Sequence, residues 1–196
     1  GAEAVMPELA GFFLYCSLNN IYKKDHKLEG SAKGKFFAKF FIGLVSFYQK
    51  TYVKELKKSK RFTPPESIYE LAEKTKTLVS IGNQTGEGWF LPGEMIELIE
   101  SGVDNIVCMQ PFGCLPNHII GKGPIKELKA RYPKANIIPI DYDPSASEVN
   151  QINRIKLMLS RAFKNLKEED NTSKISSKAK TFTVNDIKSN KESESK

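Results

Sequence analysis

The chain gathers its potentially reactive side chains in one stretch, NIVCMQPFGCLPNHIIGKG at 105–123. An apolar run, which predicts a strand, ends there in a loop that proline and glycine break. The end of this run and the loop contain two thiols, two amides and an imidazole: Cys108, Gln110, Cys114, Asn117 and His118. Such side chains could ligate a metal or hold an acyl thioester. Alternatively, they form hydrogen bonds only with the backbone of their own loop.

The two thiols of this stretch predict different roles. Cys108 lies within the expected strand, where a free cysteine is more often a small core residue than a ligand. Cys114 follows a glycine in the loop, so its sulfur is expected at a cleft, where a thiolate could ligate an iron–sulfur cluster. A cluster usually has four thiolate ligands, so the others would come from another chain or another part of a longer one.

Two other chemistries fit this stretch poorly. Cys108, Cys114 and His118 lack the paired C-x-x-C spacing of structural zinc sites. A cysteine protease needs a histidine base, and His118, four residues from Cys114, is the only histidine of the module.

A glycine-rich segment, GNQTGEGW at 82–89, is the second candidate. The backbone amides of Gly86 and Gly88 could receive an anionic group, with Glu87 between them. The spacing is neither that of the phosphate loop nor that of the dinucleotide fingerprint, and a sharp turn before a helix is the stronger interpretation.

Carboxylates form the third candidate, in and after DYDPSAS at 141–147. Asp141, Asp143 and Glu148 could bind magnesium or position a substrate amide. The stronger interpretation is that they lie near the positive N-terminal end of the last helix. Arg154 on that helix could reach the cleft or pair with Asp141.

The elements that position these loops follow a regular alternation. Apolar strands are expected at 77–82, 105–110 and 136–141, and amphipathic helices follow at 91–101, 124–132 and 146–163. This order predicts an α/β fold, a three-layer parallel sheet of βα units equal to half of a doubly wound, flavodoxin-like domain. The three candidate loops would then meet at the carboxyl edge of the sheet, where ligands bind in such folds.

Three regions are expected along the chain. Residues 1–76 form a helical segment that packs on the core, residues 77–163 form the α/β domain, and residues 164–196 form a polar, flexible tail. The helix expected at 33–60 is rich in phenylalanine at helical spacing, and we expect its first half to be strongly buried. A helix on a membrane surface is the weaker alternative.

The composition limits the partners. Residues 1–80 contain 14 Lys and Arg against 8 Asp and Glu. No nucleic-acid motif accompanies these basic residues, so we expect them to lie on solvated helix faces and not to bind nucleic acid. Three cysteines do not suggest a disulfide framework. The sequence has no long apolar run and no secretory signal at its start, so we expect a cytoplasmic protein that binds neither nucleic acid nor membrane.

The motifs GEGW, QPFGCLPNH and the Asp-Tyr-Asp…Glu-x-x-x-Asn-Arg series give the chain a specific resemblance over about 78–160. It resembles the C-terminal region of the 2-hydroxyacyl-CoA dehydratase activase-related proteins, which is itself similar to the dehydratase subunits. The chain is therefore expected to be a C-terminal fragment, or a shortened relative, of a longer parent protein.

The resemblance implies ATP-driven, low-potential electron transfer to acyl-CoA dehydratase chemistry in anaerobic metabolism, through iron–sulfur clusters of the 4Fe-4S kind. It implies that Cys114 ligates such a cluster, with Cys108 a weaker candidate. Gly86, Glu87 and Gly88 match the turn beside that site. Gln110, Asn117 and His118 are expected to face the substrate.

The implied partners are the remainder of the parent chain or a dehydratase-like subunit, and an acyl-CoA thioester. The alternative function is an α/β binding module that holds an acyl-CoA or another anionic ligand without redox chemistry. A third is an interaction domain that uses the basic helices at 23–61 to bind an acidic partner.

Overall fold

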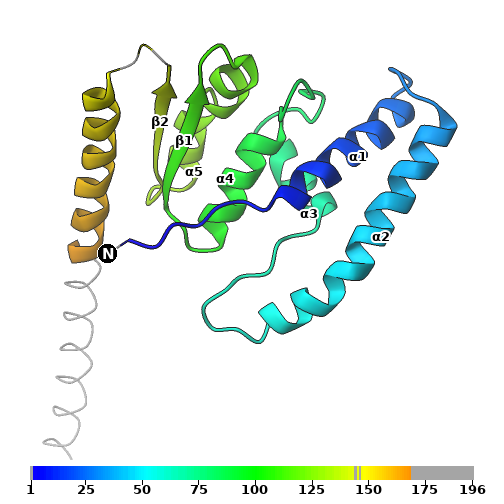
Figure 1. Ribbon diagram of the computed structural model, residues 1–196, viewed down its shortest axis with the longest axis horizontal. Helices are drawn as coiled ribbons and strands as arrows, with labels where there is room; N and C mark the ends of the chain where they lie inside the picture. Colours follow the sequence, from blue (N-terminus) through cyan, green and yellow to red (C-terminus); the bar gives the residue numbers. More distant parts are fainter. Residues whose placement is uncertain (1, 144, 146, 169–196) are drawn as a thin grey trace, which may run out of the picture. The chain divides into compact units, whose positions relative to one another are not determined.

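The computed structural model describes residues 2–143, 145 and 147–168 of the 196-residue chain. The chain divides into two compact units, 1–147 and 148–196. The described part of the first is a mixed α/β structure with a small parallel sheet (Figure 1). The second contains a helix over 148–168, and the rest of the expected tail lies outside the described residues.

Three helices begin the first unit, as the sequence predicts. α1 (Leu9–Asp25) and α2 (Ala32–Leu56) lie side by side as a hairpin, and α3 (Ile68–Lys76) follows (Figure 1). The hydroxyl of Ser31 caps α2 by accepting a hydrogen bond from a backbone N–H of its first turn. Ser67 starts α3 with a capping box, so both helix starts are set by local sequence.

The sheet consists of two parallel strands, β1 (Asn105–Pro111) and β2 (Asn136–Tyr142), paired in register from their first to their last residues. α4 (Phe90–Glu100) precedes β1, and α5 (Ile125–Arg131) connects the two strands. The arrowheads of both strands therefore point to one edge (Figure 1), the edge at which ligands bind in parallel sheets.

Two apolar clusters hold the unit together. The first joins α1, α2 and α3 to the start of α4 around the nearly inaccessible side chains of Tyr15 and Trp89. The second lies between α4, α5 and the sheet, and it includes Met95, Ile96, Cys108, Leu128 and Ile137. α4 contributes to both clusters and thus connects the helical segment to the sheet.

The strand expected at 77–82 is not formed, and the sheet of the described residues has two strands instead of three. The backbone N–H groups of Leu78 and Val79 both donate to the carbonyl of Thr75, so they close the last turn of α3. Arg131 of α5 donates to the carbonyl and hydroxyl of Thr77. The helix end and this arginine therefore occupy backbone groups that a strand would pair.

The expectation that the first half of α2 is strongly buried is also wrong. Only Ala38 and Ile42 are buried, and both face α1, whereas the phenylalanines of the helix are exposed. Apolar residues surround most of this helix, but a single packed neighbour can cover only one side of it.

None of the helices in the described part of the chain has both the length and the apolar content required to cross a bilayer.

Candidate functional site

The loop after β1 carries the thiol at the centre of the site. Gly113 adopts a φ of +70°, and the N–H of Cys114 donates to the carbonyl of Pro111 over 3.1 Å, so the chain reverses sharply at the strand end. The π-helix η1 (Asn117–Gly121) follows, closed by a 2.9 Å bond from the N–H of Lys122 to the carbonyl of Asn117. Such wide turns occur frequently at functional sites.

An amide donor lies on the sulfur of Cys114. Nδ2 of Asn117 donates to Sγ of Cys114 over 3.3 Å, and Asn117 is buried while the cysteine is partly exposed. The thiolate is the form of cysteine that binds metals. The arrangement therefore presents a sulfur ligand with a fixed donor behind it.

His118 links this loop to the end of β2. Its Nδ1 lies 2.8 Å from the carbonyl oxygen of Cys114, and its Nε2 lies 3.6 Å from Oδ1 of Asp141. With the proton on Nδ1 donated to the carbonyl, Nε2 faces the carboxylate. Asp141 pairs with Gln110 in the sheet register, so two of the predicted loops do converge.

The glycine turn before α4 packs against the same loop. Gly86 has a φ of +58°, and a Cβ added there would lie 2.8 Å from Cγ of Pro116. The neighbouring Gly88 has a φ of +44°, and its N–H donates to the carbonyl of Thr85 over 3.1 Å. These glycines therefore allow a close approach between the two loops, and the Gly88 amide is already used within the turn.

Tyr15 of α1 is a part of the site that sequence reasoning missed. Its hydroxyl donates to the carbonyl of Gly86 over 2.8 Å, across 71 residues of sequence. Burial raises the pKa of Tyr15 to about 12, so this hydroxyl keeps its proton. In the sequence, Tyr15 is one of several aromatic residues at core spacing, and no signal distinguishes it from its neighbours.

A second pair of groups lies beneath the loop. Gln110 is fully buried, and its Nε2 donates to Sγ of Cys108 over 3.1 Å. Burial raises the pKa of the Cys108 thiol. Oε1 of Gln110 has no hydrogen-bond partner within the part of the chain that the structure describes. Gln110 and Cys108 thus support the strand end from inside and do not line an open cleft.

The remaining predicted residues have no described contact with this thiol. Oδ1 of Asp143 accepts hydrogen bonds from the backbone and hydroxyl of Ser145, so it shapes its own loop. Glu87 is partly buried in the glycine turn. Glu148 and Arg154 belong to the second unit.

An iron–sulfur cluster fits the donor chemistry of this site in part. Cys114 offers one partly exposed sulfur, and the amide donor on it is of the kind that tunes the potential of a cluster. Among residues 2–143, 145 and 147–168, no three His, Cys, Asp or Glu side chains form a group that could hold a metal ion. Within these residues, any ligand role of Cys114 would therefore depend on further ligands from elsewhere.

No protein-family model, curated protein or solved structure matches the chain.

Proposed function

We propose that this chain is the C-terminal part of an activase-related iron–sulfur protein, in which it forms one wall of a cluster or substrate site. The parent would carry out ATP-driven, low-potential electron transfer linked to acyl-CoA dehydratase chemistry. The observation that carries the proposal is the thiol of Cys114 at the carboxyl edge of a parallel sheet, with the Asn117 amide on its sulfur.

Each group of the site has a role in this proposal. Cys114 provides a thiolate, and Asn117 holds that thiolate through its hydrogen bond. His118, bonded to the Cys114 carbonyl and facing Asp141, would hold the loop that carries the thiol against the end of β2. A bound cluster would supply one-electron chemistry.

The sheet and the partner belong to the same proposal. β1 pairs only with β2 among the described residues, so strands of the parent chain could extend the sheet to the three-layer, flavodoxin-like fold. The remainder of the parent, or a dehydratase-like subunit, would supply the other cluster ligands. An acyl-CoA thioester would be the substrate.

The alternative, an anion-binding module without redox chemistry, has less support. It would use the backbone amides of the glycine turn, but the Gly88 N–H already donates to the carbonyl of Thr85. Trp89, which follows this turn, is almost fully buried and bonded to Asn19, so its ring does not line an open cleft.

Anaerobic reconstitution of the full-length parent tests the proposal. We expect Cys114→Ser to lower bound iron and the visible absorption of the cluster. Cys16→Ser is the matched control, because Cys16 is an exposed cysteine on α1. If the Cys114→Ser parent keeps the iron content and spectrum of the wild type, Cys114 is not a ligand and the proposal fails.

A further inference from the structure

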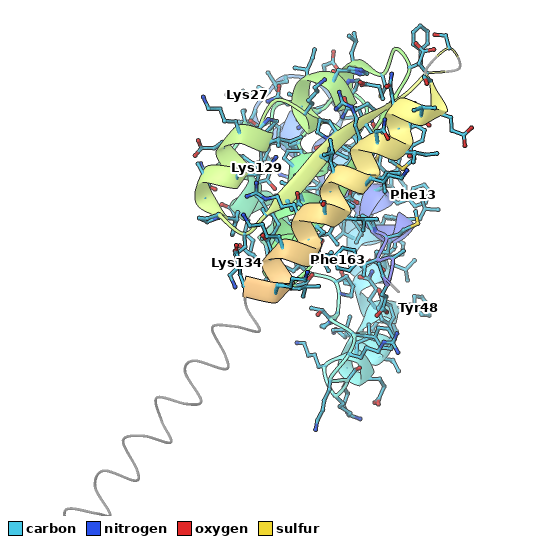
Figure 2. The ribbon with its side chains drawn as sticks, turned by 90° about the vertical axis from the view of Figure 1, so that its left-hand side faces the viewer. Phe13, Lys27, Tyr48, Lys129, Lys134 and Phe163 are labelled. Carbon is cyan, nitrogen blue, oxygen red and sulfur yellow. The ribbon has the colours of Figure 1, made fainter. Side chains whose placement is uncertain are left out.

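α2 presents a second apolar face that no described residue of the first unit covers. Its inner face packs on α1 through Ala38 and Ile42. Its outer face exposes seven large apolar side chains: Phe36, Phe37, Phe40, Phe41, Leu44, Phe47 and Tyr48. Phe13 of α1 is also exposed, and Figure 2 shows Phe13 and Tyr48 projecting on the same side. We call the seven residues the outer face of α2.

The size of the outer face indicates a protein interface. Its members are between 38% and 72% exposed. At roughly 200 Å² for each side chain, the accessible apolar area is on the order of 800 Å². The largest patch on a typical monomer is about 300–600 Å², whereas one side of a standard interface buries about 800 Å².

The charges around this face determine what can cover it. Nine Lys and Arg and one Glu lie between 33 and 61, and none of the ten residues from Phe40 to Gln49 is charged. In an antiparallel pair of identical α2 helices, Lys39 would lie beside Lys50 of the second copy, which opposes self-association. An occupant with carboxylates at its flanks is complementary instead.

The shape of the adjacent surface favours a protein over a lipid surface. A groove of about 440 Å³ runs between the start of α1 and the second half of α2, lined mainly by Leu44, Val45, Tyr48 and Tyr52. Protruding side chains of a partner protein can fill such a groove. The carboxylate of Glu8, bonded to Gln49 and Tyr52, also lines the groove.

We propose that the outer face of α2 binds an amphipathic helix of a partner protein, whose apolar stripe packs on the phenylalanines and whose flanks carry Asp and Glu. This is the helix-in-groove mode of recognition, in which apolar side chains anchor the helix and charges select it. The surface is independent of the Cys114 site, so each proposal can fail without the other.

Two designed helical peptides test this surface on the whole 196-residue chain. Both have about 18 residues, which form five turns, and the same leucine stripe, with Glu flanks in one and Lys flanks in the other. Fluorescence anisotropy of the labelled peptides gives the affinities. We expect the Glu peptide to bind at least about tenfold more tightly than the Lys peptide, because opposite charges select the partner.

Substitutions on the outer face locate the binding. We expect Phe40→Ser and Phe47→Ser each to lower the affinity for the Glu peptide by roughly tenfold, the loss typical of a central aromatic anchor. Phe112→Ser is the matched control, because Phe112 is 73% exposed in the loop after β1. All three side chains are largely exposed, so circular dichroism should show unchanged folding.

Several results would overturn the proposal. Equal binding of the two peptides would show that charge does not select the partner. Binding of neither peptide would show that the outer face of α2 does not bind such a helix. The chain could instead co-sediment with vesicles of phosphatidylcholine and phosphatidylglycerol. If Phe40→Ser abolishes that co-sedimentation, the outer face of α2 binds a lipid surface and the proposal fails. If analytical ultracentrifugation shows a dimer and Phe40→Ser dissociates it, the outer face of α2 binds a second copy of the chain and the proposal fails.

Discussion

The carboxyl group of Glu94 on α4 should make the stability of the protein depend on pH. Burial is the largest cause of its shift, and repulsion by Glu97 and Glu87 adds to it, raising the pKa of Glu94 to about 8. We consider the variant Glu94→Gln, which keeps the shape of the side chain and removes its titration. The single tryptophan, Trp89, is buried and reports unfolding by fluorescence.

The sign of the effect follows from proton binding. In the unfolded chain Glu94 titrates near 4.5, and in the folded chain it titrates near 8. Between these values the folded state binds more protons than the unfolded state, so the free energy of unfolding falls as the pH rises. Below pH 4.5 both states are protonated and the effect disappears, and above pH 8 the loss is complete.

The magnitude follows from the size of the shift. A rise from 4.5 to about 8 corresponds to at most roughly 5 kcal/mol, at about 1.4 kcal/mol for each pH unit. Glu94 is partly exposed, and solvent screening reduces this value. We expect wild type to lose about 2–3 kcal/mol more than Glu94→Gln between pH 5 and pH 8.5.

Urea titrations at a series of pH values between 5 and 8.5 measure this difference. All other titratable groups are common to both proteins, so the difference between the two curves isolates Glu94. Glu29→Gln, a change at an exposed carboxyl group, is the control and should follow wild type. Parallel curves for wild type and Glu94→Gln would refute the reasoning.

Two further predictions concern the glycine turn and the thiols. Gly88→Ala should lower the free energy of unfolding by more than about 2 kcal/mol, because its Cβ would lie 2.0 Å from a backbone oxygen at a φ of +44°. Gly43→Ala, on a helix with open space around it, should instead add roughly 0.5–1 kcal/mol in the same urea titration. Ellman's reagent should modify Cys16 and Cys114 in the folded chain but reach the buried Cys108 only after unfolding. Rapid reaction of all three thiols would contradict the described burial.

Local sequence determined the elements whose signals lie within a few residues. The apolar run before Gln110 predicted a strand, and this strand is present. The apolar segment at 77–82 carried the same strand signal, yet tertiary contacts override it, because Arg131 of α5 binds the carbonyl of Thr77. Such a contact, made 54 residues away, has no local signature.

In the candidate site, too, local features could be predicted from the sequence and tertiary contacts could not. The segment that contains Cys114, Asn117 and His118 could be selected from its residue types, and the parallel strand order placed Asp141 near it. The contact between Gly86 and Pro116 depends on how two loops approach each other, which spacing does not encode. The predicted glycine turn is present, but the Gly88 amide serves the turn itself.

The hydrogen bond of Tyr15 changes how the helical segment relates to the site. The segment at 1–76 was expected only to pack on the core, but Tyr15 also fixes the carbonyl of Gly86. Gly86 in turn lies against Pro116, two residues from Cys114. The position of the thiol is therefore connected, through a hydrogen bond and a van der Waals contact, to the helix that packs against α2. A partner helix on the outer face of α2 would bind on the opposite side of that hairpin, where it can join a larger assembly without covering the thiol.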